Sequence, residues 1–247
     1  MKITDLTGFE IIQGSFTLTF AIISFIIGIK ILIKYFSSKQ REYITIGLAW
    51  IFLSSAWWGS TFTFLSIIFF ARTLDHFTFF FVGNVFIPIA LISWIYSLAH
   101  IIYPDYEKKI LIISLVLVIP YEIVLIVFLL IDPNLVATKV GTFNSVPRLY
   151  VMIFDLLALL ITITTGILFS RMSMKVDEPE IKWRGRFLFI AFISFTIGAG
   201  IDALFPLTEI SLVLLRLLLI SSAIEYYFGF FLPDKLANLL IKNRKME

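Results

Sequence analysis

Residues 110–131 read ILIISLVLVIPYEIVLIVFLLI, a run of 22 residues in which Glu122 is the only charged side chain. The hydrocarbon core of a bilayer is about 30 Å thick, so a helix needs about 20 apolar residues to cross it. This run is therefore long enough to cross a membrane as a single helix.

Six further stretches of the chain are also apolar and long enough to cross a membrane. They are residues 9–35, 44–71, 77–102, 149–169, 187–205 and 207–232. Hydrophobic residues make up 60% of the chain and charged residues 15%, against roughly 45–50% and 25% in soluble domains. We therefore predict an all-α integral membrane protein with a seven-transmembrane helix bundle over residues 1–233 and a basic amphipathic cytoplasmic tail over residues 234–247.

Lysine and arginine residues are distributed unequally between the two ends of the predicted helices. Of 20 basic residues, 15 fall on one side, in the tail, at the end of the first span and in the connections after the first, third and fifth spans, and four fall on the other side. The side richer in basic residues faces the cytoplasm in membrane proteins. We therefore predict a multi-pass protein of the cell membrane with its N-terminus outside and its C-terminus in the cytoplasm. The net charge of +3 then reflects topology, and we expect no nucleic-acid partner.

The C-terminal tail carries apolar residues at helical spacing. Leu236, Leu239 and Leu240 share one face, and Asp234 is placed to cap the helix N-terminus. We predict a short amphipathic helix on the inner leaflet, where anionic lipid attracts its basic residues. A frayed basic tail is the alternative.

Charged residues inside the predicted spans are candidates for a functional site, because each costs about 2.5–3.5 kcal/mol on insertion scales. Glu122, Asp155 and Arg216 are predicted to share the outer-to-middle part of the bundle. Glu209 lies on the same helical face as Arg216, two turns closer to the outside. A lone guanidinium at this depth is costly, so we expect Arg216 to pair with Glu122 or Asp155. The residues predict an outward-facing polar pocket, and the alternative is an ion pair that only fixes helix register.

Aromatic and amide side chains are expected to complete this ligand-binding pocket. Trp57 and Trp58 lie halfway along the second span, and Asn84 lies in the outer third of the third span. Small-molecule sites are commonly apolar cavities in which a few polar groups converge. These three residues are therefore candidates to contact a small or lipidic ligand.

A second feature is predicted on the inner half of the seventh span. Glu225 lies nine residues after Arg216, which places it on the opposite face of the helix. With Ser221 one turn away and Tyr226 adjacent, it would form an intracellular gate or a hydrogen-bonded interhelical contact.

The sequence lacks the residues that several kinds of functional site require. There is no cysteine, and the two histidines are predicted on opposite sides of the bilayer, so we expect no metal site. A retinal Schiff base needs a lysine in the seventh helix, where the nearest is Lys235, beyond Pro233. Aspartate-based proteolysis needs two facing acids, whereas Asp155 and Asp202 are predicted at different depths. No hydrolase or phosphate-binding motif occurs, so we expect no enzymatic activity and no cofactor.

A set of short motifs lies along the predicted helices. They are Trp57-Trp58-Gly59, Phe81-Val82-Gly83-Asn84 followed by Pro88 and Trp94, Pro120, the polar run 179–186, and Pro233. With these motifs, residues 9–233 resemble the seven-helix sensor region at the N-terminus of many prokaryotic histidine kinases. Those proteins continue into cytoplasmic signalling domains, and this sequence carries none before Glu247. The resemblance therefore implies a sensor that signals to a separate cytoplasmic partner, docked on the loop from Arg171 to Arg186 and on the tail.

The function expected from these observations is that of a receptor or sensor with a small or lipidic ligand in the outer half of the bundle. The alternative is a small-solute or ion transporter or channel that uses the buried Glu, Asp and Arg cluster. Internal repeats, which mark many transporters, are not evident. A pocket closed below Arg216 would favour sensing, and a polar tunnel to both faces would favour transport.

Overall fold

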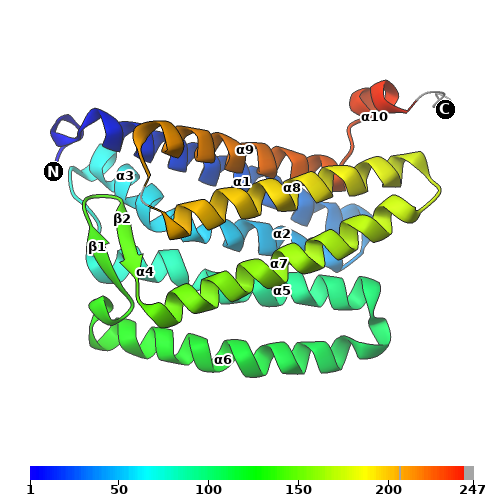
Figure 1. Cartoon of the computed structure of the whole chain (residues 1–247), viewed down its shortest axis with the longest axis horizontal. Helices are drawn as coiled ribbons and strands as arrows, with labels where there is room; N and C mark the ends of the chain where they lie inside the picture. Colours follow the sequence, from blue (N-terminus) through cyan, green and yellow to red (C-terminus); the bar gives the residue numbers. More distant parts are fainter. Residues whose placement is uncertain (206, 242–247) are drawn as a thin grey trace.

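Helices run side by side along the long axis of the protein in the computed structural model, which describes residues 1–205 and 207–241 (Figure 1). In this described part, seven helical stretches are long and apolar enough to cross a membrane. They are α1 (Gly8–Ser38), α2 with η2 and α3 (Glu42–Leu53, Ser54–Trp57, Trp58–Phe70), α4 with α5 (His76–Asn84, Phe86–Ile102), α6 (Glu107–Ile131), α7 (Leu149–Lys175), α8 (Pro179–Leu204) and α9 (Glu209–Phe230). The predicted helical fold with seven apolar spans is confirmed, and the bounds agree within about three residues except at the α7–α8 connection.

The two ends of the bundle carry different structures. At one end, which we call the hairpin end, the N-terminus lies near an antiparallel hairpin of β1 (Ala137–Val140) and β2 (Asn144–Pro147) (Figure 1). At the other, the tail end, α10 (Asp234–Leu240) follows α9. Short 3-10 turns occur at Ile3–Asp5, Pro104–Tyr106 and Pro133–Leu135. The hairpin was not predicted from the sequence, because its strands of four residues are too short to give a period-2 pattern.

Two of the spans change helical geometry part-way along their length. The second span tightens into a 3-10 turn at Ser54–Trp57, and the third is interrupted at Val85. Pro88 explains the second interruption, because it has no N–H to donate to the carbonyl of Asn84 one turn earlier. Pro120, in contrast, lies within a continuous α6.

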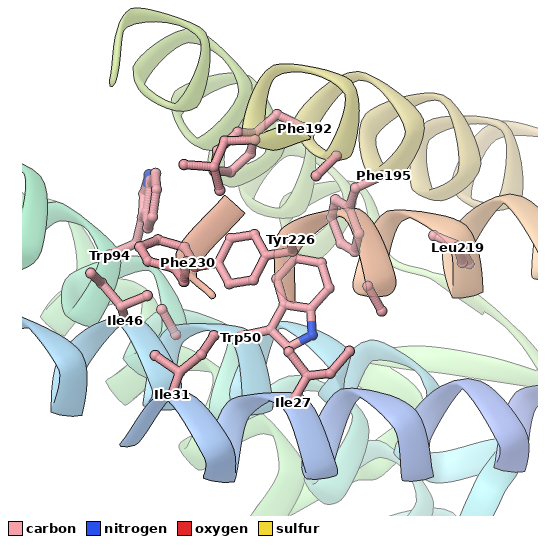
Figure 2. Close-up of a cluster of buried hydrophobic side chains, with 14 of the residues drawn as sticks. Ile27, Ile31, Ile46, Trp50, Trp94, Phe192, Phe195, Leu219, Tyr226 and Phe230 are labelled. Atoms are coloured by element: carbon pink, nitrogen blue, oxygen red, sulfur yellow. The ribbon is translucent and has the colours of Figure 1, made fainter. Parts of the chain in front are cut away.

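Buried aromatic rings pack between the helices of the middle and tail-end part of the bundle (Figure 2). The rings of Trp50 on α2 and Tyr226 on α9 stack with centroids 4.0 Å apart. Phe195 on α8 lies 5.7 Å from Trp50, and Phe230 lies 4.9 Å from Tyr226. We call this group, with Phe192, the aromatic core.

Helices α1 and α2 approach each other closely at a pair of glycines. A Cβ atom added at Gly47 would lie 2.6 Å from the backbone oxygen of Gly28, too close for any side chain. Small residues that let backbones meet are typical of helix contacts in membranes. This crossing therefore depends on Gly47.

The α7–α8 connection is shorter than the sequence predicted. The region from Arg171 to Arg186 was expected to be a loop, but α7 continues to Lys175 and α8 begins at Pro179. Charged residues continue both helices beyond the apolar run, and Arg184 pairs with Glu180 one turn apart.

The tail helix also differs slightly from the prediction. Its N-cap is Pro233, so Asp234, the predicted cap, lies in the first turn. The predicted leucines are on α10, and Leu239 is exposed. The basic residues Lys242, Arg244 and Lys245 lie outside the described residues.

Candidate ligand-binding site

A cavity of about 250 Å³ lies in the hairpin-end half of the bundle. Its walls come from α2, η2, α3, α4, α5, α7, α8 and α9, and residues of the hairpin cover it. The polar side chains of Asn84, Asp155, Asp202 and Arg216 line it, among aromatic rings. A cavity with this mixture of surfaces is the usual form of a small-molecule site.

The interruptions of the second and third spans both lie at the level of this cavity. Trp57 ends the 3-10 turn and Asn84 ends α4, and both line the cavity. The Nδ2 of Asn84 donates to the carbonyl of Phe80, 2.7 Å away on its own helix. The local breaks in helix geometry thus place two of the predicted ligand-binding residues in the cavity wall.

Arg216 is held by Asp202, so the prediction that it pairs with Glu122 or Asp155 is wrong. Its Nη1 lies 2.9 Å from Oδ2 of Asp202, and its Nη2 lies 3.3 Å from Oδ1. Its Nε donates to Thr17 on α1 at 3.2 Å. Arg216 is buried at 3% exposure, and Asp202 supplies the opposite charge that burial of a guanidinium requires.

The same carboxylate also accepts a hydrogen bond from Trp57. The indole Nε1 lies 2.7 Å from Oδ2 of Asp202, and the guanidinium carbon of Arg216 lies 5.7 Å from the Trp57 ring centroid. One acid therefore connects the second span to α8 and α9. Bidentate contact between arginine and a carboxylate adds geometric specificity to the charge attraction.

Asp155, on α7, lines the cavity without an opposite charge. Its Oδ1 is buried and has no hydrogen-bond partner among the described residues. The sequence had placed Asp155 and Asp202 at different depths, whereas both line one cavity. Asp202 is paired with Arg216, whereas Asp155 has no such partner among the described residues.

Three other predicted residues lie outside the cavity lining. Among the described residues, α6 contributes none to the lining, so Glu122 is separate, with a buried Oε2 that has no partner there. Glu209 is exposed in the first turn of α9. Trp58 donates to Ser54 and packs its ring 5.1 Å from that of Phe25, which is a packing role.

On the inner half of α9, a gate or an interhelical contact was predicted around Glu225, Ser221 and Tyr226, and Glu225 and Tyr226 make different contacts there. Ser221 donates to Glu225 at 2.7 Å, a bond within one helix rather than between helices. Tyr226 makes the interhelical contact instead, as the ring that stacks on Trp50 in the aromatic core (Figure 2).

Side-chain contacts that were not predicted hold the hairpin over the cavity. Ser60 on α3 donates to the carbonyl of Phe143 at 2.6 Å, and Thr142 donates to Glu10 on α1 at 2.5 Å. The ring of Phe143 is buried against Phe64. These contacts make the hairpin a roof for the cavity.

A separate hollow lies at the tail end, and His100 contacts two glutamates there. The hollow includes Glu42, His100 and Arg184, and no described residue lines both it and the cavity. His100 on α5 contacts Glu42 on α2 through Nε2 at 2.9 Å and Glu107 on α6 through Nδ1 at 2.8 Å. Both ring nitrogens face carboxylates, so His100 links α5 to α2 and α6.

Comparison with known proteins gives no family for this chain. No protein-family model, no curated protein and no solved structure matches it. The case for its function therefore rests on the geometry of the cavity and its surroundings.

Proposed function

We propose that this protein is a membrane receptor or sensor that binds a small ligand in the cavity and responds by a change in helix packing. The observation that carries the proposal is the position of the cavity between the hairpin and the aromatic core. The hairpin covers it, and the aromatic core separates it from the hollow at the tail end. A ligand site that is closed below is what a sensor needs, whereas a transporter needs a path to both faces.

In this proposal the hairpin end faces outside and the tail end faces the cytoplasm. The support is the excess of lysine and arginine in the connections at the tail end. The chain has no cysteine, so single cysteines can report the orientation. In intact cells, T138C on β1 should react with a membrane-impermeant maleimide, and D177C between α7 and α8 should react only after lysis. The opposite pattern would overturn the proposed orientation.

Helix α9 is the element that would transmit the signal in this proposal. Arg216 lies in the cavity wall, and Tyr226, ten residues further along the same helix, stacks on Trp50 in the aromatic core. A ligand that changes the contacts of Arg216 would shift α9 and thereby the stacked rings. A separate partner would then read the change at the ends of α7 and α8, between Arg171 and Arg186, and at the tail.

The experiment that tests the proposal is a density map of the protein purified from its native membrane. Density for a small molecule is expected in the cavity. Gly83 lines the cavity, and a Cβ there would meet no atom within 4 Å, so G83L should fill the space and abolish that density. Gly8 has equally open surroundings away from the cavity, and G8L is the matched control that should retain it. An empty cavity, or the same density in G83L, would overturn the proposal.

A small-solute or ion transporter is the second candidate, favoured by two buried carboxylates. Glu122 on α6 and Asp155 on α7 each have a buried oxygen without a partner among the described residues. The two helices touch at this level, where the rings of Tyr121 and Phe154 stack at 3.5 Å. Proton uptake by proteoliposomes that is lost in E122Q would support transport, and proteoliposomes no leakier than protein-free ones would exclude a proton path.

A further inference from the structure

Several of the donors in the walls of the cavity already have acceptors within the protein. Trp57 donates to Asp202, and Arg216 donates three of its five N–H groups, one from each nitrogen, to Asp202 and Thr17. Ser60 donates to the backbone of the hairpin roof. A ligand that presents acceptors to these walls would therefore have to compete with bonds that the protein already makes.

Acceptors, in contrast, are left over in the same walls. Asp155 has a buried carboxylate oxygen without a partner among the described residues. Asn84 uses its amide nitrogen in a bond to Phe80, and its oxygen has no partner in the described part of the chain. The remaining side-chain donors of the lining include those of Asn144 and Ser145, which belong to the roof. The walls are thus complementary to a ligand that donates hydrogen bonds.

The charges of the cavity point to the same kind of ligand. Arg216 and Asp202 neutralise each other, so Asp155 is the lining carboxylate without an opposite charge among the described residues. Aromatic rings attract cations through their negative faces. One ring of the lining, Phe79, already has a cation 4.5 Å from its centroid, the ammonium of Lys139 on the hairpin.

We propose that the cavity binds a small protonated amine with an apolar body. The ammonium donates to Asp155, and the apolar body lies among the rings of Trp57, Phe79, Phe143 and Phe195, which line the cavity. The volume of about 250 Å³ is below the roughly 300–1,000 Å³ of typical drug-sized sites, which fits one ring with a short chain. This inference rests on the proposed ligand-binding function and adds the chemical class of the ligand.

The test compares two probes of matched size and opposite charge on the full chain in lipid nanodiscs. 2-Phenylethylammonium should bind in calorimetric titration and raise the temperature of thermal unfolding, and 3-phenylpropanoate should do neither. In D155N the affinity for the ammonium should fall about tenfold or more, because one partner of a buried charge pair is removed. Glu122 is the matched control, a buried carboxylate on a helix outside the cavity lining, and E122Q should bind the ammonium as the wild type does.

The outcomes separate this inference from the proposed function. Equal binding of both probes, unchanged affinity in D155N, or no binding of the ammonium would overturn the inference. If D155N does not fold, the comparison of the two probes on the wild type decides the question. Binding of the anionic probe alone, lost in G83L, would leave the ligand-binding function in place with another ligand class. An empty cavity in protein from the native membrane would instead remove the function itself.

Discussion

Replacing Asp202 by Asn is expected to leave a positive charge without a partner inside the bundle. Arg216 is 3% exposed, and its guanidinium would lose both contacts to a carboxylate and keep only neutral acceptors, the hydroxyl of Thr17 and the amide oxygen of the new Asn. Asn preserves the shape of the side chain and can still accept from Trp57. Removal of one partner from a buried pair costs about 3–5 kcal/mol of the free energy of unfolding.

The reverse change is expected to cost less, because the two partners differ in exposure. In R216L the Asp202 side chain, 19% exposed, remains partly open to the cavity and still accepts from Trp57. We expect a loss of about 1.5–3 kcal/mol, the range for a hydrogen bond to a charged group. The double variant leaves no stranded charge, so its loss should be smaller than the sum of the single losses by about 2 kcal/mol.

The assay is equilibrium unfolding of the full chain in mixed micelles, followed by circular dichroism as the denaturing detergent is increased. E122Q is the control, because it removes a buried carboxylate that has no partner among the described residues and should cost little or nothing. Additive losses in the double variant would refute the coupling between Arg216 and Asp202. A cost for R216L larger than that for D202N would refute the argument from exposure.

Three further predictions concern elements outside the ion pair. G47A should weaken the α1–α2 contact and lower the unfolding temperature, because its Cβ would lie 2.6 Å from a backbone oxygen. A Cβ at Gly200 meets its nearest atom at 3.9 Å, so the control G200A should unfold at the wild-type temperature. Equal unfolding temperatures of the two variants would contradict this. H100Q should lower the unfolding temperature, because it breaks contacts between α5 and two other helices. His76 makes no such contacts among the described residues, so the control H76Q should leave the unfolding temperature unchanged. An equal effect of both variants would contradict the prediction. F143A should speed hydrogen exchange in the hairpin because its buried ring anchors the roof, with unchanged exchange as the contrary result.

The seven spans could be predicted from the sequence because the bilayer sets their length. A stretch of about 20 apolar residues that crosses a bilayer has to form a helix, since the hydrocarbon core holds no water to satisfy an exposed backbone. The predicted bounds were wrong at the α7–α8 connection, where the helices extend beyond their apolar residues. Helix α8 begins eight residues before Phe187, at Pro179, because a helix can continue into water when charged pairs such as Glu180 and Arg184 support it.

The hairpin roof could not be predicted, because its stability comes from contacts that the sequence does not reveal. Its strands have four residues each, and Gly141 in the turn, at φ +68°, is a weak signal by itself. The contacts that hold it link Phe143 and Thr142 to helices more than 80 residues away in the sequence. Such tertiary contacts decide the structure of segments that are too short to have their own periodic pattern.

The wrong partner for Arg216 has a geometric cause that applies to other membrane helices. The distance of Arg216 along the helix, counted in residues from the outer end, predicts the same part of the bundle as for Glu122 and Asp155. Helical side chains lean toward the N-terminus of their helix, and for α9 that is the hairpin end. A long arginine side chain therefore reaches up toward Asp202, two residues before the end of α8. Consecutive helices are usually neighbours, so an acid near the end of the preceding helix was the better candidate.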